Sequence, residues 1–274
     1  MDAIPVLNTA LLPAMLGENA RASMTNKAAS EHEAEHHPHA IRQRLLEPRR
    51  SSYLGDAVLG GIDGCVTTFA VVAGAIGAGF PGVVVMIFGV ANLLADGLSM
   101  AVSNYLGTSS QHEELEKARR EEERHISEFP EGEQEEIRQI FAAKGFSGET
   151  LERIVETVTQ NKKLWIDTML AEELGLHLEA RSPLRAGIST FVAFVSVGFV
   201  PLVPFLIGGL LPENERFLVS CIATGMAFAA IGVAKGVVLK RSLLVSGAQT
   251  LSIGGAAAVV AYLVGAWLRR AYGI

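Results

Sequence analysis

Residues 64–95 form the run GCVTTFAVVAGAIGAGFPGVVVMIFGVANLLA, which contains no Asp, Glu, Lys or Arg. A membrane-spanning helix needs roughly 20 mainly apolar residues, so this run is too long for a single span. The tetrapeptide Gly79-Phe80-Pro81-Gly82 interrupts the run near its middle with residues that favour a turn. The run therefore predicts two membrane-spanning helices joined by a tight connection.

Three further stretches without acidic or basic residues follow, at 186–212, 217–234 and 242–268. Taken with their flanks, the apolar stretches predict spans at about 54–78, 83–106, 184–209, 215–238 and 243–268. Stretches of this length fit helices, not the shorter strands of a membrane barrel. Only 19% of the residues are charged, against about a quarter in ordinary soluble chains. The sequence therefore predicts an all-α integral membrane protein with five transmembrane helices.

A strongly acidic segment separates the second and third predicted spans. From Thr108 to Ala180 there are 18 acidic and 9 basic residues, whereas the rest of the chain has 11 and 14. Stop signals at Phe129-Pro130 and Gly145 divide this segment into three predicted helices, at about 108–127, 131–144 and 147–179. The predicted organisation is a disordered tail at 1–50, spans one and two at 51–107, a cytosolic acidic metal-binding domain at 108–181, and spans three to five at 182–274.

Basic residues in the short flanks of the spans indicate the orientation, because cytosolic flanks carry an excess of Lys and Arg. Such residues precede span one and lie between spans four and five: Arg42, Arg44, Arg49, Arg50, Lys240 and Arg241. We therefore expect the N-terminus and the acidic segment in the cytosol and the C-terminus outside, although Arg269-Arg270 go against the rule. The sequence shows no recognisable targeting segment, so the expected membrane is a bacterial plasma membrane.

Metal-ligand side chains share helix faces in the acidic segment. They form three pairs at a spacing of three or four residues: Glu122 with His125, Glu133 with Glu136, and Met169 with Glu173. One such pair is best interpreted as a solvated face, but three pairs on adjacent helices favour a common site. Clustered carboxylates need a cation, and the imidazole and thioether favour Fe²⁺ over Mg²⁺ or Ca²⁺. The tail histidines His32, His36, His37 and His39 are interpreted as solvated in preference to a loose metal site.

Ionisable residues inside the predicted spans usually serve a function. Asp63 lies in span one with Thr67 one turn later, and span two has a stripe at four-residue intervals: Asn92, Asp96, Met100 and Asn104. A carboxylate at this depth needs a proton or a cation. Alternation between these two states is what a metal–proton exchanger requires. The alternative is that Asp63 and Asp96 form hydrogen bonds between helices and have a structural role only.

These residues resemble a known family. The stretch 61–74, GIDGCVTTFAVVAG, is similar to the first-span signature of the vacuolar iron transporter family, and the stretch 92–106, NLLADGLSMAVSNYL, is similar to its second-span signature. The later stretches EELGL at 172–176 and VPLVPF at 200–205 are similar as well. The resemblance covers about 52–270. It implies five spans, a homodimer, and export of cytosolic Fe²⁺, often with Mn²⁺, in exchange for protons.

The resemblance also implies roles for individual residues. Asp63 and Met100 match membrane residues that line the transport path of the family. The metal-collecting positions of its cytosolic domain fall on Glu122, Glu133, Glu136, Met169 and Glu173. Three positions depart from the family pattern: His125 replaces an expected Glu, Leu170 an expected Met, and Asn104 an expected acidic residue.

The sequence therefore predicts a dimeric Fe²⁺/Mn²⁺–proton antiporter in a lipid bilayer, which is not an enzyme. We expect no prosthetic group and no nucleic-acid partner, with Fe²⁺ or Mn²⁺ as the bound and transported ion. Two alternatives remain open. One is a membrane-anchored protein that binds or senses iron without translocation. The other is a ferroxidase, because Glu122 and His125 have the Glu-x-x-His spacing of carboxylate sites in helical bundles.

Overall fold

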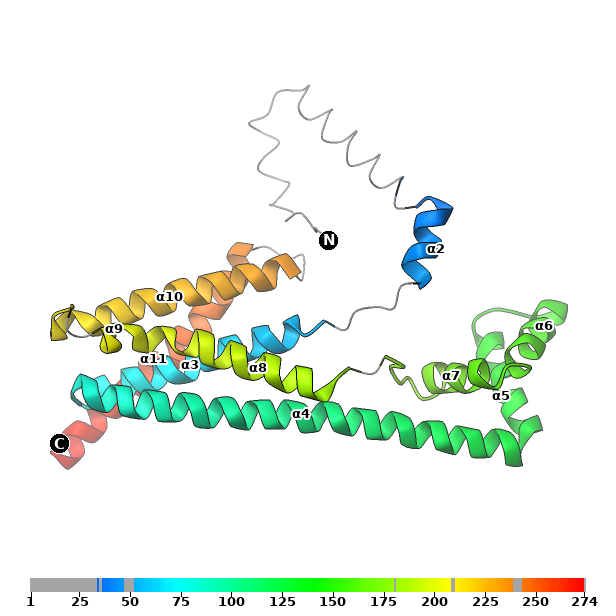
Figure 1. The fold of residues 1–274 in the computed structure, drawn as a ribbon, viewed down its shortest axis with the longest axis horizontal. Helices are drawn as coiled ribbons and strands as arrows, with labels where there is room; N and C mark the ends of the chain where they lie inside the picture. The colour runs from blue at the N-terminus through cyan, green and yellow to red at the C-terminus, as the bar shows by residue number, and fades with distance from the viewer. Residues whose placement is uncertain are drawn as a thin grey trace, which may run out of the picture. The chain divides into compact units, whose positions relative to one another are not determined.

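The computed structural model describes residues 34, 36–46, 52–179, 181–207, 210–238 and 243–273. In these residues all regular secondary structure is helical, as predicted (Figure 1). The helices are α2 (Pro38–Leu46), α3 (Leu54–Gly77), α4 (Gly82–Glu128), α5 (Pro130–Ala143), α6 (Gly148–Thr159), α7 (Lys162–Glu172), α8 (Pro183–Gly198), η2 (Val200–Leu202), α9 (Val203–Leu206), α10 (Glu213–Val238) and α11 (Leu243–Tyr272).

Within the described residues, five helical segments are long and apolar enough to cross a membrane. They are Leu54–Gly77, the apolar part of Gly82–Glu128, Pro183–Leu206, Glu213–Val233 and Gly247–Tyr272. The predicted turn at Gly79-Phe80-Pro81-Gly82 connects the first two, and Gly79 has a φ of 80°, which favours glycine. Large apolar side chains on these helices are exposed, among them Leu98, Ile222 and Trp267. An exposed apolar face of this kind suits contact with lipid. The prediction of a multi-pass membrane protein is therefore confirmed.

The third of these segments is not one regular helix. It divides into α8, the short 3₁₀ helix η2, and α9. Pro201 and Pro204 lie in the two short helices, and proline has no backbone N–H to continue the α-helical hydrogen bonds. The Ser220 hydroxyl of α10 instead donates a 2.7 Å hydrogen bond to the Pro201 carbonyl oxygen.

Helix α2 falls within the tail that the sequence predicts to be disordered. The tail histidines His36, His37 and His39 are exposed there. Most of the tail, including His32, lies outside the described residues, as do Lys240 and Arg241.

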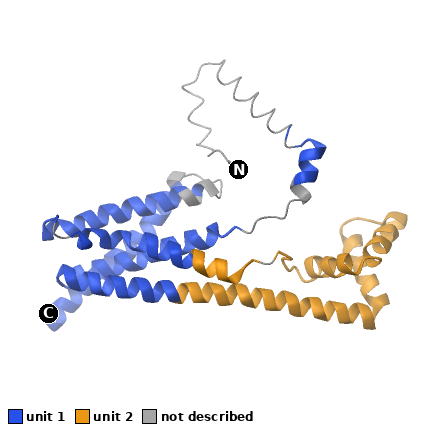
Figure 2. Ribbon diagram, in the orientation of Figure 1, with its two compact units in different colours: residues 1–98, 190–274 blue, residues 99–189 orange. Residues whose placement is uncertain are grey.

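The chain divides into two compact units (Figure 2). Unit 1 comprises residues 1–98 and 190–274, and unit 2 comprises residues 99–189. Unit 2 contains the acidic segment together with short stretches on either side of it.

Unit 1 is built around α3, which packs against α10 and α11. Glycines allow α3 to approach α8 and α11 closely. A Cβ atom at Gly64 would lie 2.4 Å from the Phe194 carbonyl oxygen, and one at Gly77 would lie 2.3 Å from the Tyr262 carbonyl oxygen. No side chain fits at such distances, so the helix backbones touch directly. Small residues at helix interfaces are typical of membrane proteins, where close packing replaces the hydrophobic effect.

Unit 2 holds the distal part of α4 together with α5, α6 and α7 through two hydrophobic clusters. The first consists of Ile137, Leu151, Val155, Val158, Trp165 and Met169. The second consists of Leu115, Ala118, Ile166 and Leu170. Ile126 of α4 packs against both clusters. An ion pair of 2.8 Å between Arg119 and Asp167 adds a polar link between α4 and α7.

The prediction of a single third helix at 147–179 is wrong. The chain leaves the helix at Gln160-Asn161, where the Asn161 side chain caps α7 by accepting a 3.1 Å hydrogen bond from the Leu164 N–H. An Asn that caps a new helix stabilises a break in a continuous apolar pattern. The helical structure also ends earlier than the predicted residue 179, because α7 stops at Glu172 and Gly175 follows with a φ of 64°. The acidic segment therefore contains the end of α4 and three more helices.

The glycine contact in unit 1 gives a testable prediction. Gly64→Ala should lower the melting temperature of the detergent-purified protein, because its Cβ meets backbone and overpacking costs about 1–3 kcal/mol. The matched control is Gly55→Ala on the same helix, where nothing lies within 4 Å of an added Cβ. It should leave the melting temperature unchanged or slightly higher, because Ala favours a helix over Gly by about 0.5–1 kcal/mol. Equal melting temperatures for the two variants would contradict this account of the α3 interface.

Candidate metal centre

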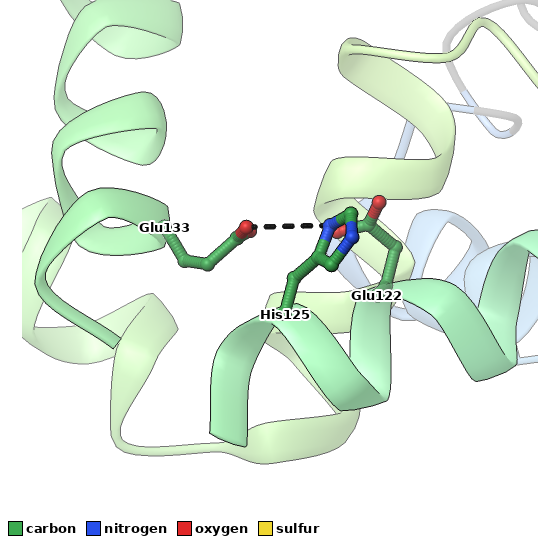
Figure 3. A group of neighbouring side chains, drawn as sticks. All are labelled: Glu122, His125 and Glu133. Carbon is green, nitrogen blue, oxygen red and sulfur yellow. Dashed lines mark ion pairs between the residues drawn. The ribbon is translucent and has the colours of Figure 1, made fainter. Parts of the chain in front are cut away.

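Three side chains that the sequence singles out converge in unit 2. Glu122 and His125 project from α4 and Glu133 projects from α5 (Figure 3). One ligand atom from each residue lies within 4.8 Å of the others. The His125 Nδ1 and Glu133 Oε1 atoms are 3.6 Å apart. This geometry fits one cation held by two carboxylates and an imidazole.

The connection between α4 and α5 produces this arrangement. Helix α4 ends at Glu128, and Pro130 starts α5 at a position where its missing N–H does no harm. The Phe129 N–H donates a 2.8 Å hydrogen bond to the His125 carbonyl oxygen, which fixes the turn next to the site. Glu133 then lies in the first turn of α5, where the positive end of the helix dipole favours a carboxylate.

The two carboxylates of the centre are buried without full hydrogen bonding. Glu122 is 5% exposed and Glu133 is 6% exposed. In both residues the Oε2 atom is buried and has no hydrogen-bond partner among the described residues. An unsatisfied buried acceptor costs about 1–3 kcal/mol, and more when it is charged. A bound cation would compensate for this cost.

Burial and like charge perturb the acid groups of the centre. Burial, followed by the Glu136 and Glu122 carboxylates, raises the pKa of Glu133 to about 7, against the opposing effect of His125. Burial and the Glu173 carboxylate raise the pKa of Glu122. Protonation of Glu133 therefore stabilises the cation-free fold at low pH. That contribution is complete below the ordinary pKa of 4.5 and is lost as the pH rises through about 7.

The other predicted ligands surround this group in different ways. Glu136 and Glu173 are exposed, and partial loss of hydration, together with the Glu136 carboxylate, raises the pKa of Glu173. Met169 is fully buried in the first hydrophobic cluster, next to the core residues of α5 and α6. Leu170, at the position where the family pattern has methionine, is fully buried in the second cluster. The structure thus joins three of the six predicted ligands closely and brings Glu136 and Glu173 within electrostatic reach of them.

The predicted path residues divide between the two units. Asp63, Thr67, Asn92 and Asp96 belong to unit 1, and all four are partly buried. The Asp63 and Asp96 carboxyl groups are close enough to interact electrostatically. The Thr67 hydroxyl donates a 2.8 Å hydrogen bond to the Asp63 carbonyl oxygen, which is a local helix contact. Asn92 Nδ2 is buried and has no hydrogen-bond partner in the described part of the chain.

The remaining two predicted path residues, Met100 and Asn104, belong to unit 2. Met100 is partly buried. The Asn104 amide donates a 3.3 Å hydrogen bond to the Ala186 carbonyl oxygen of α8, so it links two helices. This contact gives Asn104 a structural role that the stripe of polar residues alone does not reveal.

Two cavities of the described structure bear on the question of a cation site. An apolar cavity of about 410 Å³ lies between α3, α10 and α11, and its lining includes Cys221, Thr224 and Tyr262 but no acidic or basic residue. It therefore does not suit a cation. A polar cavity of about 270 Å³ in unit 2 is lined by His112 and His177, among others. The sequence patterns point to neither histidine, and the available signal is only that they lie near the two ends of the acidic segment.

The comparisons with known proteins agree with the fold. The family model described as the VIT family matches residues 54–266. A vacuolar iron transporter of Toxoplasma gondii is 33% identical over 231 residues, covering 81% of this chain and 76% of the relative. Vacuolar iron transporter 1 of Arabidopsis thaliana is 31% identical over 211 residues, covering 76% and 82%. Vacuolar iron transporter 1 of Tulipa gesneriana is 30% identical over 209 residues, covering 76% and 83%.

These relatives come from eukaryotes and bear names that place them at a vacuole. They give no support to the bacterial plasma membrane that the sequence led us to expect. The resemblance to the vacuolar iron transporter family, in contrast, is confirmed over most of the chain. The chain belongs to the VIT family.

Proposed function

We propose that this protein carries Fe²⁺, and also Mn²⁺, out of the cytosol across a membrane while protons move in the opposite direction. The observation that carries the proposal is the group of Glu122, His125 and Glu133, in which both glutamates are buried and the Oε2 atom of each has no hydrogen-bond partner among the described residues. Family membership supports it, because the relatives bear the name vacuolar iron transporter. The protein on this view is a transporter and not an enzyme.

Metal capture is assigned to unit 2. A cation that reaches the exposed carboxylates of Glu136 and Glu173 would enter the centre and displace a proton from the Glu133 carboxyl. His125 would then bind as a neutral imidazole, which favours Fe²⁺ over Mg²⁺ and Ca²⁺. Met169 would add a soft thioether ligand after a change of rotamer in the hydrophobic cluster.

Translocation is assigned to the polar residues of the apolar helices. Asp63 and Asp96 are two acidic groups there that could exchange a cation for a proton, and Met100 and Asn92 offer further ligand atoms. Ionisable groups at membrane depth are costly to keep, which supports a functional role. Two subunits would pair so that the Asp63 residues of both face one path. The acidic segment at 108–181 and the N-terminus would lie in the cytosol and the C-terminus on the opposite side.

The first test of this proposal is Asp63→Asn, which keeps the shape of the side chain and removes its charge. We expect Fe²⁺ flux into proteoliposomes, and the proton movement seen by an internal pH dye, to fall by about tenfold or more, equivalent to about 1.4 kcal/mol. The purified variant should retain the wild-type melting temperature and Fe²⁺ binding by unit 2.

Asp167→Asn is the matched control, because Asp167 pairs with Arg119 in unit 2 and lies far along the sequence from any span. It should leave flux unchanged. Wild-type flux in Asp63→Asn would refute the proposed mechanism. Iron binding without flux in the wild-type protein would favour the sensor alternative, and oxygen consumption on addition of Fe²⁺ would favour the ferroxidase.

The raised pKa of Glu133 gives a second test. Below a pH of about 7 this carboxyl holds a proton that the cation must displace. The affinity for Mn²⁺ should therefore rise as the pH increases from one unit below this pKa to one unit above it. Glu133→Gln should weaken Mn²⁺ binding at the higher pH and flatten the pH dependence. Calorimetric titration of the full-length protein in two buffers of different ionisation enthalpy measures both the affinity and the released protons.

The control for this experiment is Glu131→Gln, a change of the same type in the first turn of α5 at an exposed position. Its Mn²⁺ affinity and proton release should match those of the wild type. If Glu133→Gln behaved like Glu131→Gln, the buried group would not be a metal centre.

A further inference from the structure

Unit 2 contains a second group of metal-ligand side chains, separate from the centre at Glu122. These residues line the polar cavity of about 270 Å³, in which His112 and Glu114 come from α4 and His177 and Glu179 come from the segment after α7. None of them belongs to the predicted ligand set. The cavity lies where the two ends of the acidic segment come together, because its lining also includes Thr108 at one end and Arg181 at the other.

The His112 imidazole is the strongest sign of a missing ligand. Its Nε2 atom is buried and has no hydrogen-bond partner among the described residues. A buried nitrogen without a partner loses its hydration without compensation, at a cost of about 1–3 kcal/mol. Few such atoms occur in folded proteins, and an ion or a water molecule commonly accounts for them. A neutral imidazole nitrogen is also the commonest ligand of transition metals.

The other lining side chains suit a cation better than an anion. Glu114 and Glu179 contribute two negative charges and Arg181 contributes one positive charge, so the lining is net acidic when the histidines are neutral. His177, Glu114 and Glu179 are exposed, which leaves their side chains free to turn toward an ion. Among the described residues, only the Glu122 group has three acid or histidine ligand atoms within 4.8 Å of one another. An ion in the second cavity, which has a volume of about 270 Å³, would therefore have fewer close protein ligands and would keep several of its waters.

We infer that this cavity is a second cation site, in which His112 and His177 bind a partly hydrated transition-metal ion and Glu114 and Glu179 balance its charge. Imidazole ligands select Fe²⁺, Co²⁺ or Zn²⁺ over Mg²⁺ and Ca²⁺. The ligand class is thus a divalent transition metal, and the site differs from the first by having two imidazoles.

The position of the site along α4 suggests its use. His112 lies ten residues before Glu122 and twelve after Met100, which corresponds to roughly 15 Å and 18 Å of helix at 1.5 Å per residue. Along α4, His112 therefore lies about midway between Glu122 of the first metal centre and Met100 of the proposed membrane path. An ion could bind here on its way from Glu122 to Met100. This role rests on the proposed transport function, whereas the existence of the binding site does not.

The test is a Co²⁺ titration of the full-length, metal-free protein in detergent, followed by calorimetry and by the visible d–d absorption of the bound ion. The wild type should show two classes of site. His112→Ala with His177→Ala should remove one class, and each single change should weaken that class by about tenfold or more. Glu122→Gln with Glu133→Gln should remove the other class only. Excess Mg²⁺ should not displace Co²⁺ from the histidine site.

His37→Ala with His39→Ala is the matched control, because both residues are exposed in the tail. It should leave both classes of site in place. His112→Gln, which keeps a hydrogen-bonding group of similar size, should also lose the site, and its melting temperature shows whether the fold survives. A titration of the double His variant that matches the wild type would overturn the proposed site.

Fe²⁺ flux in the same double variant tests the intermediate stop separately. Slower flux with an intact Glu122 centre supports it, and unchanged flux after loss of the Co²⁺ site refutes the stop but not the site. Failure of the wild-type protein to transport any metal would refute the proposed function and leave the Co²⁺ result unaffected.

Discussion

Direct contact between helix backbones is the constraint on which unit 1 depends. Hydrocarbon offers neither water for exposed peptide groups nor a hydrophobic force that joins apolar helices. Gly60 and Gly64 of α3 therefore approach the carbonyl oxygens of Thr190 and Phe194 more closely than any side chain would allow. Asp63 lies between these two glycines. Its place in the fold is consequently fixed by main-chain packing on either side, which suits the role in ion exchange that we propose for it.

The helices of the acidic segment are held differently, by two ordinary hydrophobic clusters. Apolar residues alone would be enough to pack such clusters. Instead, Glu122 and Glu133 are buried at the edge of the core, beside a histidine and without full hydrogen bonding. Folding tolerates this arrangement because Glu133 can take up a proton near neutral pH. In the function that we propose, a cation would displace this proton when it binds.

Much of this architecture could be predicted from the sequence, because spans need long apolar runs and Gly79-Phe80-Pro81-Gly82 marks a turn. The spacing of Glu122 and His125 also placed both on one helix face correctly. Sequence spacing did not predict which carboxylates are buried, because contacts between helices decide that. Glu133 and Glu136 look equivalent in the sequence, yet only Glu133 is buried, because the turn at Pro130 aims it at α4. The break at Asn161 was hidden because the apolar pattern continues across it. His112 and His177 line the same cavity only because the chain returns after α7.

The burial of Glu122 and Glu133 has a consequence for behaviour at physiological ionic strength. Dissolved salt screens exposed charges over a distance of about 8 Å. The acidic outer faces of unit 2 therefore attract divalent ions only weakly, and abundant K⁺ competes with those ions for the exposed carboxylates. Buried charges are screened much less. The two kinds of carboxylate therefore respond differently when the salt concentration changes: the exposed ones lose their attraction for cations, while the buried pair retains it.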